Sequence, residues 1–98
     1  MYQFNHWYTI RYMTFLVLSR DGCKYCDMAV SLLTTHSKAF AVYKCMDGRE
    51  LRTILEEEHG MVPEHVTFPQ IFCDGVHIGG YSDLYQYVQN EFGMDADF

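Results

Sequence analysis

The sequence predicts an α/β protein in which a four-stranded mixed sheet is flanked by helices. Strand-like apolar runs alternate along the chain with segments whose apolar residues recur at helical spacing. Two thiols three residues apart, Cys23 and Cys26, separate the first strand-like run from the first helical segment. Asp74-Gly75 separates two short strand-like runs and is a strong hairpin signal. The predicted order of elements is βαβαββα.

The length and composition limit what this protein can be. A chain of 98 residues has room for one domain, and we place its core at residues 13–92. Residues 1–12 form an extension of uncertain role. A formal charge of −6 argues against nucleic-acid binding. Since no signal peptide or membrane-length apolar run is present, we expect a cytoplasmic protein that contacts no membrane.

The first half of the chain reads as strand, helix and strand. A strand is predicted at 14–19, a helix at 24–37 and a second strand at 40–46. The helix places Ala29 and Leu33 on the same face as Cys26. A strand, a helix and a further strand imply a parallel, right-handed crossover.

The second half begins with a capping signal, Asp47 followed by Glu50, and its helix is predicted to stop at Gly60. Strands at 70–73 and 76–78 should pair antiparallel. In the last helix, Ser82 is the predicted cap and Gly93 the predicted end.

The four residues Cys23-Lys24-Tyr25-Cys26, here called the tetrad, indicate redox chemistry. Two cysteines at a helix start can open and close a disulfide reversibly. Cys23 is the predicted nucleophile, Lys24 adds a positive charge, and Cys26 is placed to resolve a mixed disulfide. A zinc site and a pair of core cysteines are the alternatives. Zinc is disfavoured since Cys45 and Cys73 form no second closely spaced pair and both fall in predicted strands.

Three segments together make the chain resemble the dithiol glutaredoxins, which have a thioredoxin-like fold. They are residues 22–26 (GCKYC), 67–72 (TFPQIF) and 77–84 (HIGGYSDL). The resemblance implies a monomeric, glutathione-dependent oxidoreductase that reduces protein disulfides and glutathione mixed disulfides through the dithiol. The implied partners are glutathionylated or disulfide-containing proteins. The resemblance also implies ribonucleotide reductase as one such partner.

The resemblance also implies how glutathione, with its two carboxylates and one ammonium, would bind. A cis peptide bond before Pro69 is expected, presenting the backbone of Phe68 to an extended peptide. Ser82 and Asp83 are expected to hold the γ-glutamyl end, and Arg20 the glycine carboxylate. The complete implied set of binding residues is Arg20, Lys24, Tyr25, Thr67, Phe68, Pro69, Tyr81, Ser82 and Asp83.

The sequence departs from the family at three places. Lys24 stands where proline is frequent, Phe68 replaces valine, and Glu56-Glu57-Glu58 lies where some members offer glutamine to the glycine end. Since some glutaredoxins lacking the tetrad proline bridge a 2Fe–2S cluster through the first cysteine and glutathione, a cluster-binding dimer that uses Cys23 is the alternative function. A thioredoxin-type protein reduced by a flavoenzyme is a third reading, which the glutathione-contact motifs disfavour.

Overall fold

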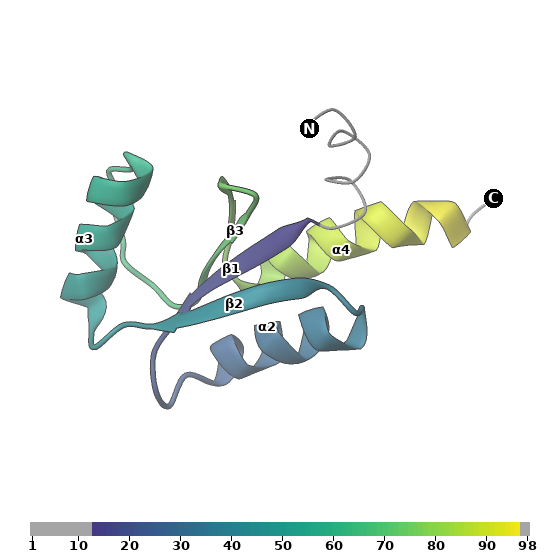
Figure 1. Cartoon of the computed structure of the whole chain (residues 1–98), viewed down its shortest axis with the longest axis horizontal. Coiled ribbons are helices and arrows are strands. Elements are labelled where there is room, and N and C mark those ends of the chain that lie inside the picture. The colour runs from purple at the N-terminus through teal and green to yellow at the C-terminus, as the bar shows by residue number, and fades with distance from the viewer. Residues whose placement is uncertain (1–12, 97–98) are drawn as a thin grey trace, which may run out of the picture.

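The computed structural model describes residues 13–96, so the prediction for residues 1–12 lies outside the described residues. The predicted order of elements and fold class are confirmed (Figure 1). The elements are β1 (Thr14–Ser19), α2 (Lys24–Thr35), β2 (Ala39–Lys44), α3 (Gly48–His59), β3 (Gln70–Cys73), β4 (Val76–Gly79) and α4 (Tyr81–Ala96). No helix within the described range is long and apolar enough to cross a bilayer.

The sheet has the strand order β2-β1-β3-β4. β1 pairs parallel with β2, as the crossover predicts, and antiparallel with β3. β3 and β4 form the predicted hairpin, in which Asp74 (φ 50°) and Gly75 (φ 85°) both have positive φ. A two-residue turn of this kind matches the right-handed twist of the strands. β2 and β4 are therefore the edges of the sheet.

Each face of the sheet is covered by different helices. On one face, α2 and α4 bury Leu33 and Leu84 against Phe15 of the central strand. On the other, α3 buries Leu51 and Leu55, with Leu18, Cys45 and Phe72 completing the cluster. The strand β1, covered on both faces, carries the chain into the tetrad at a fixed position.

Two boundaries in the first half differ from those predicted. The helix predicted at 24–37 ends at Thr35, because Ser37 takes a left-handed conformation (φ 56°) that the helix cannot include. The strand predicted at 40–46 is Ala39–Lys44, and it ends level with Ser19, where β1 itself ends. Cys45 thus lies just beyond the strand in which it was predicted.

The last helix was wrongly bounded at both ends. It begins at Tyr81, so the predicted cap Ser82 is its second residue. Gly80 precedes the helix and its carbonyl accepts from the N–H of Leu84, while the Asp83 carboxylate accepts from the N–H of Gly80 at 3.0 Å. The helix also continues through Gly93 to Ala96, since one glycine costs a helix only about 1 kcal/mol.

Candidate functional site

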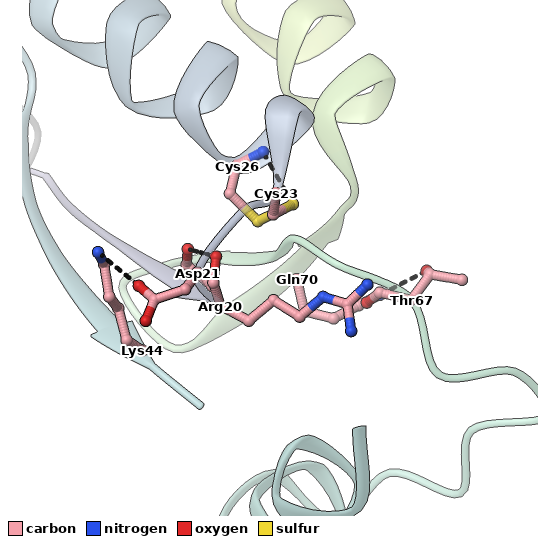
Figure 2. The surroundings of a disulfide bond; sticks show 8 residues. Arg20, Asp21, Cys23, Cys26, Lys44, Thr67 and Gln70 are labelled. Atoms are coloured by element: carbon pink, nitrogen blue, oxygen red, sulfur yellow. Dashed lines mark hydrogen bonds and ion pairs between the residues drawn. A yellow bond between two sulfur atoms is a disulfide. The ribbon is translucent and has the colours of Figure 1, made fainter. Parts of the chain in front are cut away.

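The two tetrad cysteines form a disulfide at the start of α2 (Figure 2). Cys23 caps the helix with an extended backbone (φ −98°, ψ 107°), and its Sγ accepts from the N–H of Cys26 at 3.2 Å. Cys26 is 1% exposed, whereas Cys23 is only half-buried. An incoming thiol or disulfide can therefore reach the sulfur of Cys23 far more readily than that of Cys26.

The turn that leads from β1 into the tetrad exposes its charges. Gly22 takes a positive φ of 75°, which a side chain would disfavour, and lets the chain reverse before α2 begins. Asp21 pairs with Lys44 at 3.0 Å, as Figure 2 shows. Lys24 is exposed beside Cys23. The helix N-terminus and Lys24 both favour a thiolate on reduced Cys23.

Two surface depressions adjoin the disulfide and together contain most of the predicted binding residues. The first, of about 430 Å³, is lined by Arg20, Gly22, Cys23, Lys24, Tyr25, Gly48, Val66, Thr67 and Phe68. The second, of about 300 Å³, is lined by Tyr25, Phe68, Pro69, Tyr81 and Ser82. Because Tyr25 and Phe68 line both, the two depressions form one continuous groove, here called the catalytic groove.

The far wall of the catalytic groove is the segment before β3. The peptide bond between Phe68 and Pro69 is cis, as expected from the resemblance. The guanidinium of Arg20 lies 5.2 Å from the centre of the Phe68 ring, which holds a cation at this end of the groove. In Figure 2 the Arg20 side chain extends away from Asp21 toward Thr67. This end of the groove is thus suited to an anion.

Hydrogen bonds behind this wall fix its shape. The Gln70 side-chain amide donates to the carbonyl oxygen of Thr67 at 2.9 Å, and its oxygen lies 2.7 Å from a ring nitrogen of His77. His77 therefore bonds to Gln70 and lines neither depression of the catalytic groove. The hydrogen bonds connect the hairpin to the loop that carries the cis-proline.

Of the predicted binding residues, Asp83 alone lines neither depression of the catalytic groove. It lines a separate depression of about 340 Å³ beside β4, and one carboxylate oxygen is bonded to Gly80. Gly79 (φ 128°) lies against this carboxylate so closely that a Cβ there would collide with it. Asp83 thus has a structural role at the start of α4, while Ser82 lines the catalytic groove next to it.

Three glutamates and two cysteines that the sequence analysis considered lie outside the catalytic groove. Glu56, Glu57 and Glu58 are exposed on α3 and line neither of its depressions, so they do not repel an anion there at close range. Cys45 and Cys73 are buried. Burial, reinforced by nearby carboxylates, raises the pKa of the Cys45 thiol to about 11. Both thiols are therefore poor nucleophiles.

Sequence reasoning missed three residues near the site. Gly48 and Val66 line the catalytic groove, and neither carries a side-chain group that signals binding. Tyr85 is 42% exposed and its ring lies 6.3 Å from that of Tyr81. Its spacing of four from Tyr81 in a helix was the signal that could have found it.

Comparison with known proteins agrees with this geometry. Residues 12–78 match the family model for glutaredoxin. The chain is 33% identical over 70 residues to glutaredoxin 1 of Rickettsia bellii, covering 71% of each, and 35% identical over 90 residues to glutaredoxin 1 of Escherichia coli, covering 86% of this chain and all of that protein. The crystal structure of glutaredoxin 1 from Francisella tularensis, complexed with cacodylate, aligns with a TM-score of 0.70 at 25% identity, covering 83% of this chain and 98% of that one.

Proposed function

Because this chain belongs to the glutaredoxin family of thiol–disulfide oxidoreductases, we propose that it uses glutathione to reduce protein disulfides and glutathione mixed disulfides. The observation that carries the proposal is the Cys23–Cys26 disulfide, which opens onto a groove with a cation at one end and a helix N-terminus at the other. Glutathione carries an anionic carboxylate at each end, which matches this arrangement.

The groove suggests one orientation for glutathione. Arg20 and Lys24 line the end that would receive the glycine carboxylate. Ser82, in the first turn of α4, lines the end that would receive the γ-glutamyl carboxylate on backbone N–H groups. Tyr25 and Phe68 line both depressions, so the cysteine of the tripeptide would lie between them and Cys23. Asp83 would accept the ammonium with the carboxylate oxygen that Gly80 leaves available.

The reaction follows as a series of thiolate displacements. The Cys23 thiolate attacks one sulfur of a protein disulfide, forming a mixed disulfide and releasing the other sulfur as a thiolate, which takes a proton from water. The Cys26 thiol then loses its proton to water and, as a thiolate, attacks the sulfur of Cys23. This step releases the second protein thiol and forms the Cys23–Cys26 disulfide. For a glutathionylated substrate, the Cys23 thiolate attacks the glutathione sulfur, forming a disulfide between Cys23 and glutathione and releasing the protein cysteine as a thiolate, which takes a proton from water.

Two glutathione molecules regenerate the dithiol. The thiolate of the first attacks Cys23 and displaces Cys26, giving a mixed disulfide between Cys23 and glutathione. The thiolate of the second attacks the glutathione sulfur of this mixed disulfide, which releases Cys23 and glutathione disulfide. The two electrons that reduced the substrate are thus supplied by the two glutathiones.

The test compares electron donors. Reduction of a small glutathione mixed disulfide is measured with glutathione, glutathione reductase and NADPH, and separately with thioredoxin reductase and NADPH. We expect turnover only with the glutathione system. Turnover with thioredoxin reductase alone would assign the protein to the thioredoxin type and overturn glutathione dependence.

The cluster-binding alternative requires only Cys23 from each of two chains, with glutathione thiolates as the other ligands. A 2Fe–2S cluster takes four protein or thiol ligands. Within residues 13–96 no group of three or more candidate ligands comes together, and Cys23 is the one cysteine there that is not buried. Any cluster would require thiolates from outside the chain, so we derive no step through one.

A further inference from the structure

A further depression adjoins the catalytic groove and is larger than either of the two depressions that form it. It has a volume of about 650 Å³ and runs along α2, from Gly22 and Lys24 at the tetrad to Thr35 at the helix end, with Tyr81 on its other side. Lys24 also lines the catalytic groove, as does Tyr81. This depression, here called the α2 groove, therefore adjoins the catalytic groove.

The length of the α2 groove suits a polypeptide. From Lys24 to Thr35 a helix rises about 16 Å, which equals about five residues of extended chain. A tripeptide already accommodated in the catalytic groove would leave this length uncovered. The part of a substrate that could occupy it is the chain next to the substrate cysteine.

The α2 groove combines apolar surface with the charged side chains of Lys24 and Asp27 and the hydroxyl groups of Ser31 and Thr35. Met28 and Leu32, both half-buried, contribute apolar surface, and the exposed Ser31 forms part of the lining. The flexible thioether of a methionine adapts to differently shaped partners. Such a surface is suited to several protein substrates rather than to one fixed ligand.

A row of three tyrosines, the outer two of them exposed, extends the same surface onto α4. The rings of Tyr25 and Tyr81 lie 6.0 Å apart, and those of Tyr81 and Tyr85 lie 6.3 Å apart. Tyr25 is 53% and Tyr85 42% exposed. Exposed aromatic rings of this kind are enriched where proteins bind partners. Tyr85 touches neither depression of the catalytic groove, so glutathione binding does not account for its exposure.

We propose that Tyr85 and the α2 groove form a docking surface for the polypeptide of the substrate, and that they select apolar or aromatic residues beside its cysteine. This inference rests on the proposed function, because it assigns the substrate class of the same site. Tyr81 stands between the two parts of the surface, so a substrate chain leaving Cys23 meets both.

The test uses two matched pairs of variants. Tyr85→Ala removes the outer ring, and its control Gln86→Ala truncates the neighbouring exposed residue, which lines the depression on the other side of α4. Ser31→Arg obstructs the α2 groove, and its control Thr34→Arg places the same side chain on α2 outside the groove. All four positions are exposed, so the fold should tolerate each change.

Each variant is assayed with two substrates: a glutathionylated peptide of about ten residues with leucine and tyrosine beside its cysteine, and the mixed disulfide of glutathione and free cysteine. Tyr85→Ala and Ser31→Arg should each raise the KM for the peptide about three- to tenfold and leave the small substrate unchanged. The controls should match the wild type with both. Equal effects on both substrates, or none on the peptide, would overturn the docking surface.

Two further results separate this proposal from others. A wild-type protein that reduces neither substrate with glutathione would refute the proposed function itself, whereas normal turnover of the small substrate with unchanged peptide kinetics in the variants would refute only the docking surface. Sedimentation of the wild type and Tyr85→Ala tests a second copy of this chain as the occupant. Dimers that Tyr85→Ala dissociates would overturn the assignment to substrate.

Discussion

The N–H of Cys26 points at the sulfur of Cys23 across 3.2 Å. One residue of the dithiol therefore stabilises charge on the other through its backbone, while its own sulfur stays buried beneath the helix start. A thiolate on Cys23 accepts this hydrogen bond more strongly than a thiol does. The geometry gives the two cysteines unequal roles, and this inequality can be tested.

Replacing each cysteine by serine should have different consequences. Cys23→Ser should abolish all activity, because the attacking sulfur is lost. Cys26→Ser keeps the amide that faces Cys23, so it should retain substantial reduction of a glutathione mixed disulfide and lose dithiol-dependent reduction of a protein disulfide. Steady-state assays with the two substrates check this. A Cys26→Ser variant as inactive as Cys23→Ser with the mixed disulfide would contradict the assignment.

Lys24→Pro tests whether the lysine contributes to activation of Cys23. Proline is favoured in the first turn of a helix, and the extended backbone of Cys23 (φ −98°, ψ 107°) is the conformation that precedes proline. A lysine at this end opposes the helix dipole by about 0.3–1 kcal/mol, so the variant should be at least as stable as the wild type in urea unfolding. With the cation removed, the thiolate fraction of Cys23 at neutral pH should fall.

The thiolate fraction is read by titrating thiolate absorbance in a Cys26→Ser background. Lys44→Gln serves as the control, because Asp21 already pairs with the Lys44 charge. The midpoint should rise in Lys24→Pro and stay unchanged in the control. A midpoint that stays or drops in Lys24→Pro would mean that the helix terminus alone activates Cys23.

Asp83 has two separable contributions, a hydrogen bond to Gly80 and a negative charge. Asp83→Asn keeps an oxygen that can accept from Gly80 at the start of α4 and removes only the charge. If Asp83 receives the glutathione ammonium, this variant should raise the KM for glutathione by the equivalent of about 1.5–3 kcal/mol and unfold at an unchanged urea concentration. Asp83→Ala should show the same kinetic loss and also lose about 1 kcal/mol of stability.

The comparison with the wild type decides between the two roles. Kinetics of Asp83→Asn that match the wild type at subsaturating glutathione would leave Asp83 with the structural role alone. The γ-glutamyl end would then depend on backbone N–H groups at Ser82.

The features that sequence reasoning predicted depend on local signals. The tetrad, the Asp74-Gly75 turn and the stop at Gly60 are each specified by a few adjacent residues, and the structure has all three. The predicted start of α4 was wrong because Ser82 and Asp83 are both suited to cap a helix. Ser82 is a good cap by type, but the Asp83 carboxylate accepts a hydrogen bond from the N–H of Gly80, and the helix starts at Tyr81.

The surface that sequence reasoning did not find depends on tertiary packing. Nothing adjacent to Met28 in the chain indicates that α4 will lie beside α2, so the α2 groove exists only once Leu33 and Leu84 share one core. The position of Tyr85 relative to Tyr25 follows from the same packing. Local patterns predict each helix and its buried face, whereas the surface between two helices requires their arrangement.

The pH dependence of the free energy of unfolding tests whether the Cys45 thiol is buried. This thiol has a pKa of about 11 in the folded chain against an ordinary value of 9.0, because burial, and then Glu50 and Asp47, disfavour the thiolate. As pH rises above 9.0, the unfolded chain loses this proton first, so the free energy of unfolding falls. The contribution is fully present below pH 9.0 and is lost as pH approaches about 11.

Urea unfolding of the wild type and Cys45→Ala from pH 7 to about pH 10 measures this contribution. Both are compared in a Tyr43→Phe background, since the hydrogen bond to Glu50 also raises the pKa of Tyr43. Cys45→Ala should start less stable, because a small cavity replaces the sulfur, and then lose stability more slowly than its reference above pH 9.0. Parallel curves would mean that the Cys45 thiol titrates alike in the folded and unfolded chains, and that it is open to solvent rather than enclosed between α3 and the sheet.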